Sequence, residues 1–439
     1  MVTSSISVMA APSECAQNMN SDNNQTVVLS DAQPEVMNNA QPEVVKDAQA
    51  GSVTDTRLTW GAIEDIVNVS EPSGMSVTYL DNGITRTRND CKEFSNNMSD
   101  GWYVLSKDVT TSDAVVTSGK VNLILKDNTT LNANNGIYVT QGSELIIWAQ
   151  SNIKDSTTGK INAKPENGPG IGSVKNTMGG DITINGGRIE ATGGDYGAGI
   201  GGGRGEKSGI GNITINSGFI TAQGGKRAAG IGKGQQNNKG GTITINGGEV
   251  NTTGGKSGAG IGGGEDRGTS NVIINGGIVN IKGGEYAAGI GGGEEGDQDN
   301  KVTINGGTVN AKGYVGIGAG DAYGYSSIGK RFNGAEVEIN GGTVTTNGIG
   351  GGSRGTNGPI TINGGVVNST TSLGAAIGSS TDDDQRNPIT INGGVVNAKC
   401  ESGDAAIGAG EDAETQYNNA VEFYNAVKNF LENNLSARH

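Results

Sequence analysis

The most constraining feature of this chain is a motif that recurs about every thirty residues. Versions of ITINGG recur between Ile182 and Val396, and the Asn that closes each strand-like segment falls at Asn185, Asn216, Asn246, Asn275, Asn305, Asn340, Asn363 and Asn392. Versions of GAGIGGG keep the same spacing, with their Ile at Ile171, Ile200, Ile231, Ile261, Ile290, Ile317, Ile349, Ile377 and Ile407. A fixed period of this length is typical of a solenoid, in which each repeat packs on its neighbours.

Each repeat contains three short segments in which apolar residues alternate with polar residues or Gly, the pattern of a strand with one buried face. In the first copy the inward positions centre on Ile182, Ile189 and Ile200. The corners between segments are Asn-Gly-Gly or Gly-Gly, which adopt positive φ at low cost. We therefore expect an all-β fold, a single right-handed parallel β-helix with three strands per rung and rungs about 4.8 Å apart.

Composition excludes the other repeat architectures. The chain contains 79 Gly, and Gly costs roughly 1 kcal/mol in a helix interior, which argues against helical arrays. The glycines also lack the strict every-third spacing of collagen. The repeated Asn should stack on its copies and form a hydrogen-bonded ladder, which is a structural feature and not a binding site.

The chain divides into four parts around this coil. Residues 1–55 carry seven acidic residues against Lys46 alone and are expected to form a disordered acidic leader. Residues 56–100 should form an irregular N-terminal cap segment, and residues 101–410 should form the β-helix. Apolar residues recur at helical spacing within residues 411–439, which predicts an amphipathic helix. That helix would cap the last rung or dock onto an identical subunit.

Charge and cysteine content limit the partners and the compartment. The formal net charge is −14, which repels nucleic acid, and the sequence contains no apolar stretch long enough to span a membrane. The cysteines, Cys15, Cys91 and Cys400, have neither metal-site nor disulfide-framework spacing. The start SSISVMAAPSE resembles the end of a signal peptide, so we expect a truncated or processed leader. These features favour a secreted or cell-surface protein.

The opening block of the coil, together with the repeats, resembles a known group of proteins. Residues 102–150 read WYVLSKDVTTSDAVVTSGKVNLILKDNTTLNANNGIYVTQGSELIIWAQ and are followed by TGKINA and by GAGIGGG and ITINGG units. This combination is similar to the Gly-rich surface proteins of anaerobic Firmicutes, described as carbohydrate-binding-domain or adhesin-like parallel β-helix proteins. The resemblance covers about residues 100–410 and lies in scaffold residues. It implies a β-helix on the cell surface and, by inference, carbohydrate binding.

Catalysis is not expected from these motifs. The single histidine, His439, is the last residue, and no Ser, Cys or Lys has an activating neighbour by motif. β-Helix enzymes that cleave polysaccharides need clustered carboxylates, or calcium with a basic residue, on one face. A polysaccharide-degrading enzyme is the second alternative function. The first alternative is a structural subunit that self-assembles into a surface layer or filament through the solenoid ends or the terminal helix.

No motif requires a cofactor, but two acidic loops are candidates for Ca²⁺, which prefers several oxygen ligands about 2.5 Å away. The candidate ligands are Glu294, Glu295, Asp297 and Asp299 in one loop and Asp382, Asp383 and Asp384 in the other. Neither loop has a recognised calcium motif. Solvated protection of a sheet edge is the alternative interpretation of these acids.

Tyrosines are the candidate ligand-binding residues, because aromatic rings stack on the apolar faces of sugars. Tyr196 and Tyr286 occupy the same position in their repeats, with Arg227 and Ser257 between them. The longest repeat adds a second group of candidates, Tyr314, Asp321, Tyr323 and Tyr325. This grouping predicts a non-enzymatic, adhesin-like protein that binds polysaccharide or host glycan. Tyrosines that only cover a loop are the alternative interpretation.

Overall fold

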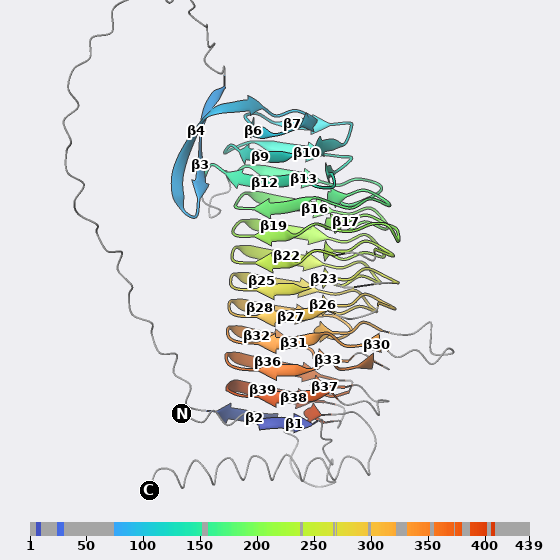
Figure 1. Cartoon of the computed structure of the whole chain (residues 1–439). Helices are drawn as coiled ribbons and strands as arrows, with labels where there is room; N and C mark the ends of the chain where they lie inside the picture. The colour runs from blue at the N-terminus through green and yellow to red at the C-terminus, as the bar shows by residue number, and fades with distance from the viewer. Residues whose placement is uncertain are drawn as a thin grey trace, which may run out of the picture.

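The computed structural model describes residues 6–9, 24–29, 74–151, 157–237, 240–266, 268, 270–296, 300–321, 332–351, 355–372, 374–379, 387–401 and 405–408. Figure 1 shows short strands stacked rung upon rung along one axis, as predicted for a parallel β-helix. The predicted C-terminal helix over residues 411–439 and most of the predicted leader lie outside the described residues.

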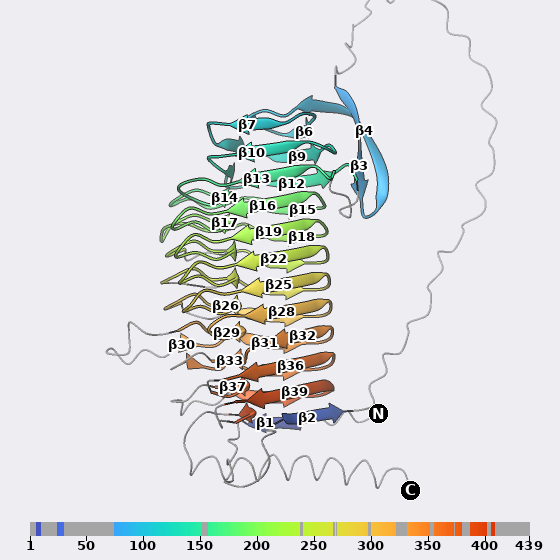
Figure 2. The same cartoon turned by 180° about the vertical axis from the view of Figure 1, so that it is seen from behind.

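Three long sheets of mainly parallel strands form the sides of the coil (Figures 1 and 2). The first sheet has 14 strands. In chain order they are β1 (Ile6–Met9), β3 (Met75–Asp81), β4 (Ile84–Glu93), β6 (Gly101–Leu105), β9 (Lys120–Leu125), β12 (Glu144–Ala149), β15 (Asp181–Ile184), β18 (Ile213–Ile215), β21 (Ile243–Ile245), β24 (Val272–Ile274), β27 (Lys301–Ile304), β31 (Glu336–Ile339), β35 (Ile360–Ile362) and β38 (Pro388–Ile391).

The second sheet has 12 strands. They are β2 (Asn24–Leu29), β7 (Val109–Thr111), β10 (Thr130–Ala133), β13 (Lys160–Ala163), β16 (Arg188–Thr192), β19 (Phe219–Gln223), β22 (Glu249–Thr253), β25 (Ile278–Lys282), β28 (Thr308–Lys312), β32 (Thr343–Thr346), β36 (Val366–Thr371) and β39 (Gly394–Cys400).

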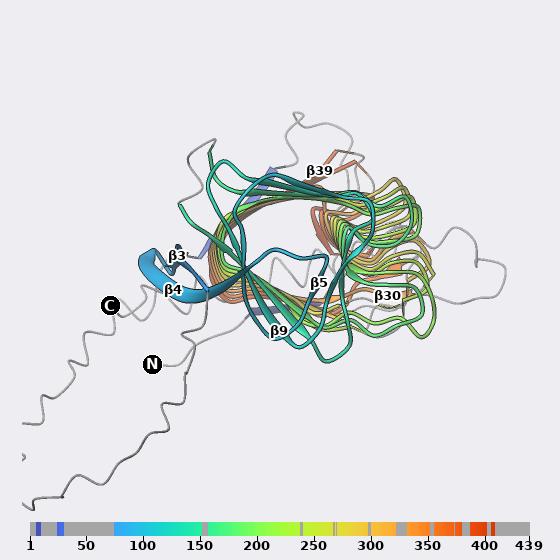
Figure 3. The ribbon, with the colours of Figure 1, turned by 90° about the horizontal axis from the view of Figure 1, so that it is seen from above.

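The third sheet also has 12 strands, most of them very short. They are β5 (Asn97–Met98), β8 (Val115–Thr117), β11 (Ile137–Val139), β14 (Ile171–Ser173), β17 (Ile200–Gly202), β20 (Ile231–Gly232), β23 (Ile261–Gly262), β26 (Ile290–Gly291), β29 (Ile317–Gly318), β33 (Ile349–Gly350), β37 (Ile377–Gly378) and β40 (Ile407–Gly408). A separate pair, β30 (Phe332–Asn333) and β34 (Gly355–Thr356), lies among the loops that project on one side of the coil (Figure 3).

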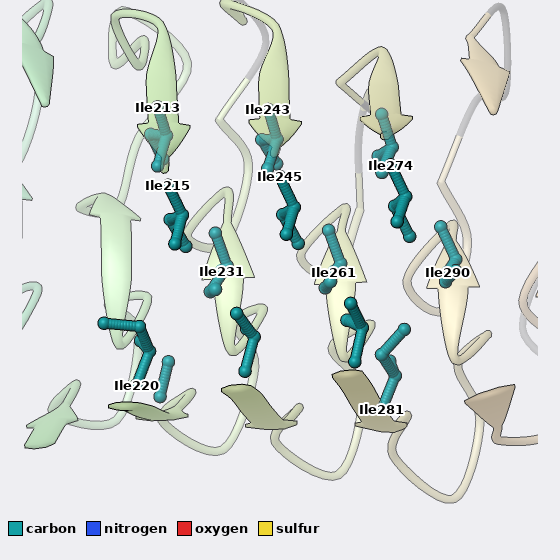
Figure 4. Close-up of a cluster of buried hydrophobic side chains, with 14 of the residues drawn as sticks. Ile213, Ile215, Ile220, Ile231, Ile243, Ile245, Ile261, Ile274, Ile281 and Ile290 are labelled. Carbon is teal, nitrogen blue, oxygen red and sulfur yellow. The ribbon is translucent and has the colours of Figure 1, made fainter. Parts of the chain in front are cut away.

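The core consists of columns of aliphatic side chains. Ile231, Ile261 and Ile290 are paired residues of adjacent third-sheet strands, and each is 0% exposed. Figure 4 shows these residues stacked in columns beside Ile213, Ile245 and other first-sheet and second-sheet residues. Full burial of one such side chain stabilises the fold by roughly 1.5–3 kcal/mol. The inward positions predicted from the alternating pattern are confirmed.

The predicted Asn ladder is present at the corner after the first sheet. Each side-chain amide donates to the side-chain oxygen of the Asn one rung earlier at 2.7–2.8 Å, in the order Asn392, Asn363, Asn340, Asn305, Asn275, Asn246, Asn216 and Asn185. A second set of Asn pairs, which we did not predict, lies on the outer face of the second sheet: Asn132–Asn162, Asn251–Asn280, Asn280–Asn310 and Asn368–Asn397. Both sets link side-chain amides of successive rungs along the axis.

From β14 to β40, a Gly follows the Ile of each third-sheet strand, and there is a steric reason for it. Gly262 has a φ of 130°, and a Cβ there would collide with the backbone oxygen of Gly291 on the next rung. Gly232 and Gly291 repeat this geometry one rung away on either side. A side chain is therefore disfavoured at this corner by both backbone strain and contact.

The N-terminal cap segment is regular where the structure describes it, in contrast to the irregular segment we predicted. β3 and β4 form an antiparallel hairpin with a turn at Asn82 and Gly83, whose φ values are 49° and 79°. Positive φ at both positions matches the two-residue turns that favour hairpins. The ring of Tyr79 packs 5.0 Å from those of both Trp102 and Trp148, so the hairpin covers the outer face of the first rungs.

Two segments of the predicted disordered leader form strands. β1 pairs antiparallel with β38, where Ile6 faces Ile391, and β2 pairs antiparallel with β39, where Val27 faces Val396. The last rung otherwise presents unpaired backbone groups, which an added strand can satisfy. The prediction of a leader that is disordered throughout therefore needs correction at residues 6–9 and 24–29.

Candidate ligand-binding groove

A groove of about 820 Å³ crosses several rungs where the second-sheet strands end. We refer to it as the groove. Its lining residues come from the strand ends and the following loops: Thr253, Gly254, Gly255, Lys256, Lys282, Gly283, Gly284, Glu285, Lys312, Gly313, Tyr314, Asn347, Thr370, Thr371, Ser372 and Glu401. The glycines of the lining let the loop backbones pack closely, because a Cβ at Gly255 or Gly284 would collide with the backbone oxygen of Gly225 or Gly255 on the preceding rung.

Two lysines occupy the strand side of the groove. Lys282 and Lys312 are the last residues of β25 and β28 and are directly paired across the two rungs. The preceding residues, Ile281 and Ala311, are 4% and 0% exposed and face the core. Successive strand residues point to opposite faces, so both lysines point outward, about 4.8 Å apart along the axis.

A third lysine lies on the loop side with two companions. The Lys256 ammonium is 3.6 Å from a carboxylate oxygen of Glu285 and 5.0 Å from the ring centroid of Tyr286. The charge of Glu285 is the main cause that raises the pKa of Lys256. Tyr286 donates its backbone N–H to the Lys256 carbonyl at 3.2 Å, which fixes the two residues one rung apart.

The predicted tyrosine column has the expected register. Gln235, Glu265, Glu294 and Asp321 donate their backbone N–H groups to the carbonyls of Tyr196, Arg227, Ser257 and Tyr286 respectively, at 2.8–3.1 Å. Tyr196 and Tyr286 are therefore equivalent residues three rungs apart. Tyr196 does not line the groove. Its ring lies 4.5 Å from the Arg204 guanidinium and 5.9 Å from that of Arg227.

The second predicted group is only partly described. Tyr314 lines the groove and donates its backbone N–H to the Ala287 carbonyl at 2.9 Å. Asp321 is only 7% exposed, so its carboxylate is poorly placed to meet a ligand from solvent. Tyr323 and Tyr325 lie outside the described residues.

The acidic turns do not assemble a metal site in the described part of the chain. Glu294 and Glu295 lie together on one turn, whereas Asp297, Asp299 and Asp382 to Asp384 fall outside that part. No group of three or more His, Cys, Asp or Glu side chains able to hold a metal occurs among the described residues.

Glu265 lies on the equivalent turn one rung earlier than Glu294 and is held by two side-chain donors. It accepts hydrogen bonds from Arg227 at 3.0 Å and from Gln235 at 2.7 Å. Its burial, and next the charge of Asp266, raise the pKa of Glu265 despite the opposing charge of Arg227. These contacts tie Glu265 to the scaffold, outside the groove lining.

Two of the three groove lysines, Lys282 and Lys312, were not predicted from the sequence. Lys282 and Lys312 are both the residue that ends a second-sheet strand, 30 positions apart. Comparing outward positions between repeats, in addition to inward ones, would have found this pair.

These observations define a parallel β-helix protein. Seven segments match a family model described as a beta helix repeat: residues 182–204, 213–232, 243–265, 272–294, 302–321, 360–381 and 389–411. The matches cover most of the clean repeats and support the fold implied by the resemblance noted from the sequence. No curated protein and no solved structure matches the chain. Within the described residues, no helix has the length and apolar character needed to cross a membrane.

Proposed function

We propose that this protein is a non-enzymatic β-solenoid, secreted or displayed on the cell surface, that binds polysaccharide or host glycan along the groove. The observation that carries the proposal is the combination, in one groove, of the Tyr314 side chain with Lys256, Lys282 and Lys312. Tyrosine rings stack on sugar faces, and ammonium groups donate hydrogen bonds to sugar oxygens. Tyr286 extends this surface beside Lys256.

The shape of the groove also favours a polymer over a small molecule. Its lining residues run from Thr253 to Glu401 and belong to several consecutive rungs, so a chain lying along the axis meets equivalent positions repeatedly. We expect weak binding per site, roughly micromolar to millimolar, that strengthens when many copies are displayed together. An adhesin role like that of the Gly-rich surface proteins of anaerobic Firmicutes is part of this proposal.

The test is a glycan array combined with pulldown on insoluble polysaccharides, using the purified full chain. We expect retention on at least one polysaccharide without release of new reducing ends and without a requirement for Ca²⁺. Cleavage of the retained polymer would favour the enzyme alternative. Loss of retention in EDTA, restored by Ca²⁺, would favour the calcium-binding interpretation of the acidic loops.

A self-assembling structural subunit is the second candidate, and the last rung supports it. The edge formed by β38 and β39 accepts the antiparallel strands β1 and β2. The same strands from a second copy would find the same backbone partners. Electron microscopy and light scattering of the purified chain distinguish the two candidates, because filaments in the absence of any glycan binding would favour assembly.

A further inference from the structure

We infer that the groove selects acidic polysaccharides, whose carboxylate or sulfate groups bind between Lys282 and Lys312. The inference rests on the proposed glycan-binding function and adds the chemical class of the ligand.

Several other lysines of the second and first sheets have a carboxylate close by. Lys160 also faces a cation, Arg188, but both contact Glu190, at 2.8 and 3.3 Å. Lys120 is the register partner of Glu144, and Lys301 is the register partner of Glu336, with N–O distances of 2.9 Å in both pairs. In those pairs a carboxylate on the next rung neutralises the ammonium.

Lys282 has another lysine, Lys312, in the equivalent position. Like charges directly opposite each other destabilise a sheet. An anion bound between the two ammonium groups would remove that repulsion.

Among the described residues, no ion pair involves Lys282 or Lys312. The two glutamates of the groove lining have other partners: Glu285 lies 3.6 Å from Lys256, and Glu401 lies 3.9 Å from Lys399. The two ammonium groups are therefore available to an external anion.

The local charge contrasts with that of the molecule. The chain carries a net charge of −14, whereas the groove lining holds three lysines against two glutamates. A positive site on a negative molecule attracts anions locally, while the overall charge disfavours long polyanions such as nucleic acid. The attraction between charges at such an exposed site is screened by salt, with a Debye length of about 10 Å at 0.1 M. Binding should therefore weaken as the ionic strength rises.

The repeat of the coil suits a polymer that carries one acid group per sugar. A chain lying along the axis would place successive acid groups near successive rungs, about 4.8 Å apart. Lys282 and Lys312 are on successive rungs. Tyr314, beside them in the groove, supplies a ring for the apolar face of one sugar.

The experiment compares polygalacturonate with its methyl-esterified form, which keeps the sugar backbone and removes the charge, and adds heparin as a sulfated probe. Affinity electrophoresis and calorimetry are run on the wild type, on the double variant K282Q/K312Q and on the control K92Q/K107Q. The control removes the same charge from two exposed lysines near the opposite end of the coil. Thermal melting verifies that all three proteins fold.

We expect the wild type to bind at least one acidic probe and to bind the esterified polymer more weakly. K282Q/K312Q should lose roughly tenfold in affinity and most of the salt dependence, whereas the control should behave as the wild type. Equal binding of both polygalacturonate forms, or an unchanged K282Q/K312Q variant, would overturn the inference and leave glycan binding intact. A wild type that binds neither these probes nor any neutral polysaccharide would overturn the proposed function itself.

Discussion

The side-chain amide of Asn275 donates a 2.7 Å hydrogen bond to the side-chain oxygen of Asn246 on the preceding rung, and its own oxygen accepts an equal bond from Asn305. Asn275→Ala removes both bonds and leaves one donor and one acceptor without a partner in the ladder. We expect a loss of roughly 1–2 kcal/mol in the free energy of unfolding. The loss stays this small because the ladder is solvent-exposed and water can replace the missing partners. Urea denaturation measures this loss, and an unchanged midpoint would contradict a stabilising role for the ladder.

A buried charge in the core columns should be far more damaging. Ile261 is 0% exposed between Ile231 and Ile290. Ile261→Asp places an unpaired carboxylate there and should cost several kcal/mol. Ile278 is the matched control, because it is 50% exposed on the second sheet. Melting curves should show a large loss for Ile261→Asp and a small one for Ile278→Asp, and equal losses would refute the inward assignment.

The third-sheet glycines should tolerate no side chain. Gly262→Ala combines strain at a φ of 130° with a collision against the Gly291 carbonyl. Gly142→Ala separates the two causes, because Gly142 also has positive φ, 77°, but no atom lies within 4 Å of the added Cβ. We expect about 1 kcal/mol of destabilisation at Gly142 and clearly more at Gly262. The free energy of unfolding is measured by chemical denaturation. Equal losses for Gly142→Ala and Gly262→Ala would show that the collision with the next rung does not destabilise the fold.

Lys233 should make stability depend on alkaline pH. It is 2% exposed, and burial lowers the pKa of its ammonium from 10.5 to about 8. The unfolded chain therefore holds this proton more tightly than the folded protein, so the free energy of unfolding should rise as the pH increases from about 8 to 10.5.

Lys233→Met keeps the volume and removes the charge. The variant should be more stable than the wild type by roughly 3 kcal/mol at pH 7, and this difference should shrink as the pH rises towards 10.5. Urea denaturation of both proteins at pH 7, 9 and 10.5 measures the difference. A difference that stays constant with pH would contradict the lowered pKa of the buried Lys233 ammonium.

The sequence predicts the coil well because its inward residues repeat. Ile261 and Asn275 each belong to a column, and every copy adds evidence for the same strand or corner. The hairpin around Tyr79 was not foreseen, because it occurs once and its role depends on contact with Trp102 and Trp148, which are distant in sequence. Strands β1 and β2 were not predicted either, because their polar, acidic surroundings indicate disorder. Their partner strands also lie near the opposite end of the chain.

The candidate groove was less predictable than the fold for a physical reason. Outward positions are free to vary, so Lys282 and Lys312 form no long column and produce no periodic signal. Tyr286 and Tyr314 were identifiable as aromatics, but their relation to the lysines depends on how the loops follow the second sheet. Only the three-dimensional register brings Tyr314 and the lysines to one groove and places Tyr286 beside Lys256 at its edge.

Retention on polysaccharide by the double variant Y286A/Y314A, relative to the wild type, tests the central claim most directly. Tyr196→Ala is the matched control, because Tyr196 occupies the same column as Tyr286 but lies three rungs away, beside Arg204 and Arg227 instead of the groove residue Lys256. The account predicts that the wild type and Tyr196→Ala are retained equally, that Y286A/Y314A loses at least roughly tenfold in affinity, and that all three melt at similar temperatures. Retention of Y286A/Y314A at the wild-type level, or a wild type that is retained on no polysaccharide, would contradict it.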